Sequence, residues 1–204
     1  MRIQIAGSGW AYCFSLPRRL GHTAYLSDYL KLGMETYALE DVWLKTQNKA
    51  HLRHAHTIEY NKQFRVGTFL IVPFPVAHTN SDGSDCPNAG FLIYSTVTKE
   101  KMLFITDAGY IESRFPPVDY IMIECNHVDV EDYKDELEYV NAFVESRRVK
   151  SHLSLDRCVD FLKNQDLSKV QWVRLLHLTE SQGNIYNIIL DRMNKEFNNI
   201  KFII

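Results

Sequence analysis

The sequence lacks several features that mark particular classes of protein. No run approaches the roughly 18–20 consecutive apolar residues of a membrane-spanning helix. No Lys/Arg-rich run is present and the formal net charge is -2, so we expect neither a membrane nor a nucleic-acid polymer as partner. The first residues do not show the order of a secretion signal, in which a positively charged segment is followed by an apolar segment and then by small residues. This predicts a cytoplasmic protein. Repeats and Pro/Ser-rich linkers are also lacking, which predicts a single domain over 1–204.

Cysteine is sparse and widely spaced. The four cysteines, at positions 13, 86, 125 and 158, form no CxxC pair. This spacing argues against a zinc ribbon and against a disulfide framework. We therefore expect reduced thiols, most of them packed as small hydrophobic side chains.

The chain alternates between strand and helix patterns. Apolar runs predict strands and apolar residues at helical spacing predict helices. The predicted strands are 3–5, 35–38, 68–74, 90–94, 101–107, 120–126, 170–178 and 201–204. The predicted helices are 22–32, 39–52, 129–138, 154–164 and 185–197. Strands dominate the middle and helices the later part, which indicates an α/β or α+β sheet sandwich with outer helices.

Three of the apolar runs lead into a side chain that can bind a metal. These side chains are His78, Asp107 and His177. Each one alone is more often a hydrogen-bonded loop residue than a ligand. Loops at strand ends assemble sites in sheet proteins, and His with Asp suits Zn²⁺ or Mn²⁺. The three together therefore predict a metal site at one edge of a sheet.

Several segments in order resemble the metallo-β-lactamase fold superfamily, and more closely the phage and bacterial relatives of the anti-Pycsar cyclic-nucleotide phosphodiesterases. The segments are MRIQIAGSG, HTAYLSDYLKLGMETYA, VPFPVAH, GFLIYS, KMLFITDAGY, YIMIECN and VKSHLSLDRC. The resemblance covers nearly all of residues 22–180. It implies an α/β fold, the αββα sandwich of that superfamily, and a homodimer in the cytoplasm, which is the host cytoplasm if the chain is phage-encoded. It also implies hydrolysis of a small-molecule nucleotide with two Zn²⁺ or Mn²⁺ ions.

The resemblance also implies roles for single residues. Those that it places on the metals are His22, His78, Asp107 and His177. Asp107 would bridge both ions, and His152 would be a catalytic residue that is not a ligand but gives a hydrogen bond or a proton to the phosphate. Asn126 and Glu124 would support the ligands from behind.

The chain departs from the family at its HxHxDH motif. If His22 is the last residue of that motif, then Pro17, Arg19 and Gly21 stand where three ligands belong. We therefore expect a shortened N-terminal half-sheet and one bound ion or none, because a stable zinc site needs three or four protein ligands. Two alternatives remain open: a catalytically inactive nucleotide-binding relative, and a rearranged, non-functional variant.

A second group of histidines, His51, His54 and His56, also has metal-like spacing. By resemblance it belongs to a variable loop away from the metals, so we do not expect it to replace the missing ligands. His127 is interpreted as a surface histidine. Asp82 and Asp85 are interpreted as turn residues.

Overall fold

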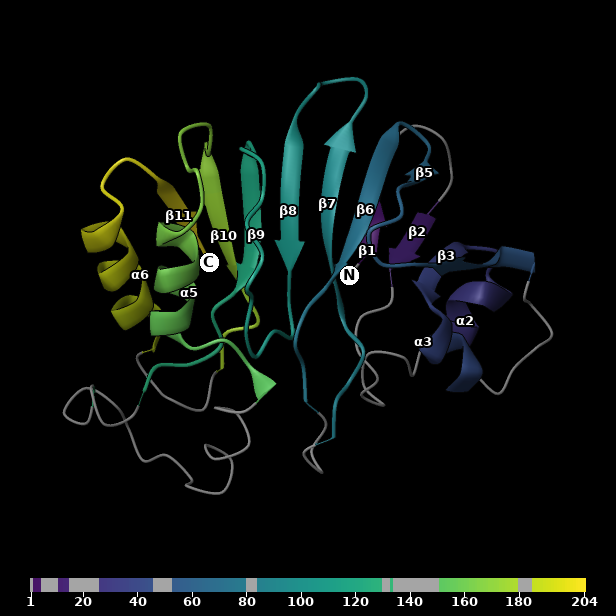
Figure 1. The fold of residues 1–204 in the computed structure, drawn as a ribbon, viewed down its shortest axis with the longest axis horizontal. Coiled ribbons are helices and arrows are strands. Elements are labelled where there is room, and N and C mark those ends of the chain that lie inside the picture. Colours follow the sequence, from purple (N-terminus) through teal and green to yellow (C-terminus); the bar gives the residue numbers. More distant parts are fainter. Residues whose placement is uncertain are drawn as a thin grey trace.

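Two β-sheets organise the chain (Figure 1). The structure is a computed structural model. It describes residues 2–4, 11–14, 26–45, 53–79, 84–129, 133, 151–179 and 185–204. For 2–4 and 11–14 the description covers the backbone.

The larger sheet has seven strands in the order β11-β10-β9-β8-β7-β6-β5. Its strands are β5 (Phe64–Val66), β6 (Phe69–Pro75), β7 (Ala89–Ser95), β8 (Lys101–Ile105), β9 (Tyr120–Glu124), β10 (Trp172–Leu176) and β11 (Lys201–Ile203). From β5 to β8 the neighbours pair antiparallel. From β8 to β11 they pair parallel. The carboxyl ends of β8, β9 and β10 therefore meet at one edge of the sheet.

The smaller sheet has four strands in chain order, and only its first pair is antiparallel. Its strands are β1 (Arg2–Gln4), β2 (Ala11–Phe14), β3 (Glu35–Leu39) and β4 (Ala55–Ile58). Two short helices accompany it, α2 (Leu26–Lys31) and α3 (Glu40–Lys45). Figure 1 places this sheet and its helices beside the β5–β6 end of the larger sheet.

Two apolar cores hold these layers together. One lies where α5 (Leu155–Lys163) and α6 (Ile185–Glu196) cover the parallel half of the larger sheet (Figure 1). On α5 the buried residues recur at helical spacing, and Ser154 caps the helix by accepting a hydrogen bond from the Arg157 backbone N–H. The other core joins α2, α3 and the smaller sheet to β5–β8. Burial on one face of each element thus fixes the layer order.

Gly90 on β7 is required by close packing. Gly90 pairs with Phe74 on β6, and a Cβ at Gly90 would lie 2.3 Å from Cζ of Phe74. The missing side chain therefore makes room for the Phe74 ring, which packs on Phe115 with 4.5 Å between ring centroids. Because Phe115 belongs to the loop between β8 and β9, this contact holds that loop against β6.

The structure confirms the α/β class and most predicted elements, with ends shifted by a few residues. The interpretation of the segment with His51, His54 and His56 as a variable loop is wrong at residues 55 and 56, because Ala55–Ile58 forms β4 and pairs with β3, whereas residues 50–52 lie outside the described ranges. Strands β2 and β5 were not predicted. The predicted acidic helix 129–138 lies mostly outside the described residues, as do residues 22–25. No helix in the described ranges has the length and apolar character to cross a membrane.

Candidate metal centre

Three strand ends bring polar side chains together at one sheet edge. Glu124 is the last residue of β9 and pairs with Leu176 on β10, so His177 follows directly beside it. Asp107 comes two residues after the end of β8, whose last residue pairs with Ile123. Parallel register alone thus places Asp107, Glu124 and His177 at neighbouring positions.

A fourth side chain, His152, reaches the same edge from the loop before α5. Its loop is held against the end of β9, because the backbone N–H of Asn126 donates to the Leu153 carbonyl over 2.8 Å. A bridge between His127 and Ser154 continues this pairing to the start of the helix. The position of His152 therefore depends on the same strand that ends in Glu124.

These four residues form a tight group, called the Asp107 cluster below. Its ligand atoms all lie within 4.8 Å of one another. Nδ1 of His152 lies 2.6 Å from Oε1 of Glu124, and Nδ1 of His177 lies 3.0 Å from the same oxygen. Oδ1 of Asp107 lies 3.3 Å from Nδ1 of His177 and 3.9 Å from Nδ1 of His152. Two carboxylates and two imidazoles therefore converge on one small volume.

The carboxylates of this cluster are deeply buried. Asp107 is 1% exposed and Glu124 is 0% exposed. Burial alone would raise the pKa of Glu124. The hydrogen bonds from His152 and His177 lower it by more than burial raises it, so the pKa of Glu124 lies below its ordinary value. Its other oxygen accepts a hydrogen bond from the Ala108 backbone N–H over 2.6 Å. Glu124 is therefore held ionised and in one orientation.

The backbone is strained at two members of the cluster. Asp107 has φ 52° and His177 has φ 56°, values that residues other than glycine adopt at a cost of about 1–3 kcal/mol. Side-chain amides hold these backbones: Asn88 donates to the Asp107 carbonyl over 2.8 Å, and Asn126 donates to the His177 carbonyl. Because neighbouring amides hold this strained backbone, the directions of the Asp107 and His177 side chains are fixed at a cost in local stability.

His78 lies beside the cluster rather than within it. It is buried, its Nδ1 lies 2.9 Å from the Ser151 carbonyl oxygen, and its ring centroid is 5.7 Å from that of His152. An ion would therefore use Nε2 of this ring. His78 also lines a cavity of about 640 Å³, called the His78 cavity below, to which Tyr60, Asp85, Tyr110 and Arg157 contribute.

The other predicted residues fall into different surroundings. His22 and Asp82 lie outside the described residues. Cys125 is not a thiolate, because its hydrogen bond to Cys158 and its burial raise the pKa of its thiol well above the ordinary value. The prediction of a surface position for His127 is wrong, since its side chain is 1% exposed.

Glu124 was expected to support the ligands but lies in the cluster itself. The sequence signal for this position is its place as the last residue of an apolar strand, the same signal that singled out Asp107 and His177. Arg157 and Tyr110 were not selected from the sequence, since an exposed arginine on a helix and a loop tyrosine carry no pattern of their own.

The donor set fits a divalent transition-metal ion. Zinc binds imidazole nitrogens and carboxylate oxygens at about 2.0–2.2 Å in tetrahedral sites, and manganese also accepts carboxylates. Asp107, Glu124 and His177 already give the three donors that one ion needs, without help from the residues missing from the amino-terminal motif, and His152 lies within 4.8 Å of them. The two buried carboxylates also supply the negative charge that a dication balances.

Comparison with known proteins places the fold. No protein-family model matches the chain, and no curated protein sequence matches it. Solved structures do match. YhfI of Bacillus subtilis, a metallo-β-lactamase fold protein, superposes with a TM-score of 0.66 at 14% identity over 95% of this chain and 74% of its own. Yeast PDE1 also gives 0.66 at 14% identity, over 94% of this chain and 64% of its own.

A third match is a diphosphatase of the PhnP family, with a TM-score of 0.55 and 14% identity over 94% of this chain and 67% of its own. At these identities the likeness concerns architecture alone. It agrees with the two sheets and with the helices that accompany them. The chain therefore has the metallo-β-lactamase fold.

Proposed function

We propose that the protein is a metal-dependent phosphodiesterase that hydrolyses a small cyclic nucleotide with one Zn²⁺ or Mn²⁺ ion. The observation that carries the proposal is the buried Asp107 cluster of two carboxylates and two imidazoles. The structural likeness to yeast PDE1 and to a PhnP-family diphosphatase supports phosphoester chemistry. The sequence resemblance described above supports the cyclic nucleotide.

Asp107, Glu124 and His177 would hold the ion, because their donor atoms face one another at the strand ends. An ion bound there supplies Lewis acidity toward a phosphoryl oxygen and lowers the pKa of a bound water. Asn126 keeps the His177 backbone in place, and Asn88 does so for Asp107. The amide side chains thus fix the ligands before any ion arrives.

His152 would transfer the proton. In the hydrolysis, the attacking water loses a proton to solvent and its oxygen forms a bond with phosphorus, while the ester bond from phosphorus to the leaving oxygen breaks. The leaving oxygen needs a proton, which Nε2 of His152 would give, because Nδ1 is held by Glu124 over 2.6 Å. Glu124 thus fixes the orientation of the His152 ring.

The His78 cavity would receive the substrate. Its volume of about 640 Å³ lies within the ordinary range of small-molecule sites. His78 joins this cavity to the cluster through its edge contact with the His152 ring. Arg157 adds a guanidinium group of the kind that suits a phosphate ester.

The test combines metal content with turnover. Protein stripped with a chelator is reloaded with Zn²⁺ or Mn²⁺, analysed for metal and assayed with 3′,5′-cyclic nucleotides. We expect about one equivalent of ion, and a loss of at least about 100-fold in kcat for His152→Gln with metal content retained. His54→Gln, a histidine of the smaller sheet, is the matched control and keeps both.

Less than about half an equivalent of ion, together with no turnover for either metal, would reject the enzyme and favour the inactive nucleotide-binding relative. Loss of the ion in His152→Gln would instead make His152 a ligand and remove its assigned role in proton transfer.

A further inference from the structure

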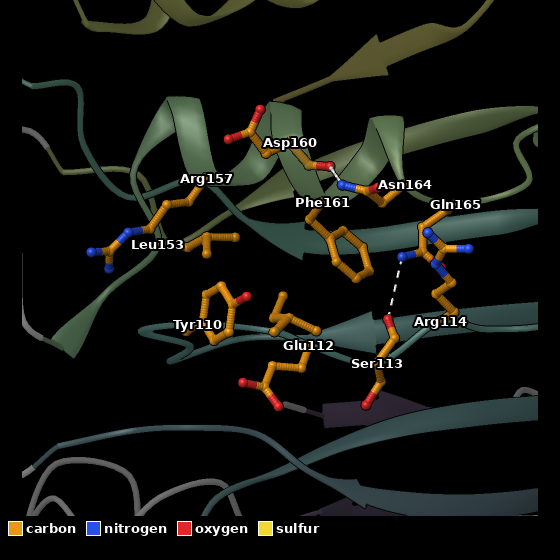
Figure 2. A pocket seen from close by; sticks show the side chains of 11 residues that line it. Tyr110, Glu112, Ser113, Arg114, Leu153, Arg157, Asp160, Phe161, Asn164 and Gln165 are labelled. Carbon is orange, nitrogen blue, oxygen red and sulfur yellow. Dashed lines mark hydrogen bonds between the residues drawn. The ribbon is translucent and has the colours of Figure 1, made fainter.

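A second cavity lies between residues 110–114 and α5, and none of the four cluster residues lines it (Figure 2). Its volume is about 390 Å³, and it is called the α5 cavity below. We propose that the α5 cavity binds a planar heteroaromatic group, such as a nucleobase, carried by the phosphoester that is cleaved at the Asp107 cluster. This inference rests on the proposed function and names the part of the substrate that gives specificity.

One part of the α5 cavity is apolar and aromatic, within a lining that is otherwise mostly polar. Figure 2 shows the rings of Tyr110 and Phe161 facing the same space, with Leu153 beside them. Tyr110 is 54% exposed, a large exposure for an aromatic side chain on the described surface. Phe115 supports Phe161 with 6.3 Å between ring centroids. Flat π-faces of this kind favour a stacked planar ring over a branched aliphatic group.

The rim of the α5 cavity carries both signs of charge. Arg114 and Arg157 provide guanidinium groups, and Glu112 and Asp160 provide carboxylates. Within the part of the chain that the structure describes, no hydrogen bond or ion pair engages the side chains of Glu112 and Arg114. The formal charges at the rim cancel, so the rim does not favour a bare anion. It suits a neutral ring that has both donor and acceptor atoms on its edge.

The loop that forms one wall is fixed to the helix that forms the other. Gln165 accepts a hydrogen bond from the Phe115 backbone N–H over 3.0 Å and donates to the Ser113 carbonyl over 3.3 Å. At the other end, Arg157 donates to the Gly109 carbonyl over 2.8 Å. The cavity is therefore formed before a ligand binds, which lowers the entropy cost of binding.

The α5 cavity adjoins the proposed phosphate site. Tyr110 and Arg157 line both the α5 cavity and the His78 cavity, so they form a shared wall. Tyr110 follows Asp107 by three residues, and Leu153 follows His152 directly. A nucleotide with its phosphate directed to the cluster would therefore have its ring beside this shared wall, and the proposal assigns the ring to the α5 cavity.

Tyr110→Ala tests the proposal, and Tyr186→Ala on α6 is the matched control, since Tyr186 is also exposed. Hydrolysis is compared for adenosine 3′,5′-cyclic monophosphate and for the same cyclic sugar phosphate without a base. We expect Tyr110→Ala to reduce kcat/KM about tenfold more for the nucleotide than for the abasic ester, as expected from the loss of one stacking ring. Tyr186→Ala should reduce both equally or not at all.

Titration calorimetry of adenosine into protein held metal-free by a chelator gives a readout that does not depend on turnover. We expect binding that Tyr110→Ala weakens about tenfold and Tyr186→Ala leaves unchanged. No adenosine binding, or equal binding by Tyr110→Ala, overturns the inference, as does an equal effect on both esters. If neither ester is hydrolysed while adenosine binding depends on Tyr110, the proposed hydrolysis fails and the base site stands.

Discussion

Two clusters of described residues each combine two histidines with at least one carboxylate, yet they differ in burial, in charge balance and in backbone geometry. In the Asp107 cluster two buried carboxylates meet His152 and His177 at the ends of parallel strands. In the smaller sheet Glu35 on β3 meets His54 and His56, and Glu35 is 24% exposed. Each oxygen of Glu35 faces one imidazole, and the His56 ring stacks on Tyr37 with 4.6 Å between centroids.

The difference lies in charge balance and backbone geometry. In the smaller sheet the two imidazoles satisfy the single carboxylate, and Arg53 donates to Nε2 of His54 over 3.0 Å. The result is a clamp between two paired strands, Glu35 on one and His56 on the other. In the Asp107 cluster a second carboxylate is added and two members have positive φ. Residue types alone therefore do not distinguish a structural clamp from a candidate metal centre, whereas burial, charge and strain do.

Removal of one carboxylate from each cluster gives the largest expected contrast. Asp107→Asn keeps the size of the side chain but removes a charged donor, so we expect metal affinity to fall by more than about 100-fold, beyond the loss typical of residues behind the ligands. Glu35→Gln should leave metal content unchanged. Elemental analysis and competition with a chelator measure both variants. Full metal binding by Asp107→Asn would show that the ion, if any, lies elsewhere.

A smaller effect is expected at the amide that holds the strained backbone. Asn126→Ala removes the donor to the His177 carbonyl, which frees the backbone at His177 from its φ of 56°. We expect metal affinity to fall about 10- to 100-fold, the range for residues that orient ligands. Asn194→Ala on the exposed side of α6 is the control and should bind metal like the wild type. An unchanged metal affinity in Asn126→Ala would mean that the strained backbone at His177 does not contribute to metal binding.

The sequence predicted the part of the site that follows from strand patterns. Asp107 and His177 were selected because apolar runs lead into them, and parallel strands bring such ends together. Glu124 has the same strand-end position, but the resemblance placed it behind the ligands, and its place within the cluster follows from the register of β9 with β10. His152 was selected only through the family resemblance, since it lies in a loop.

The same limit explains the error at the smaller sheet. The family resemblance placed His54 and His56 in a variable loop, and the error concerns His56, because β4 is short and two of its four residues, His56 and Thr57, are polar. Their partner Glu35 lies on a different strand, and only the β3–β4 pairing brings it opposite them. A long-range pairing of this kind cannot be found from the spacing of histidines alone.

The smallest expected effect concerns the stability that Glu35 gives to the clamp in the smaller sheet. Hydrogen bonds from His56 and His54, in that order, hold the pKa of Glu35 below 4.5. A lowered folded-state pKa contributes stability that is present above the unfolded value and is lost as the pH falls through the folded value. Glu35→Gln should therefore lower the free energy of unfolding by about 0.5–1 kcal/mol at neutral pH, as expected for a partly exposed ion pair.

The destabilisation caused by Glu35→Gln should shrink as the pH falls below 4.5, because Glu35 of the unfolded chain then takes up a proton before the folded-state carboxyl does, and the interaction is lost once the folded-state carboxyl is protonated as well. Urea unfolding at about pH 7 and about pH 3.5 measures it. Glu59→Gln, which removes a carboxylate paired with Lys62 on the surface, is the control. A difference that grows toward low pH would mean that the ionised carboxylate of Glu35 destabilises the folded state, which would contradict the clamp.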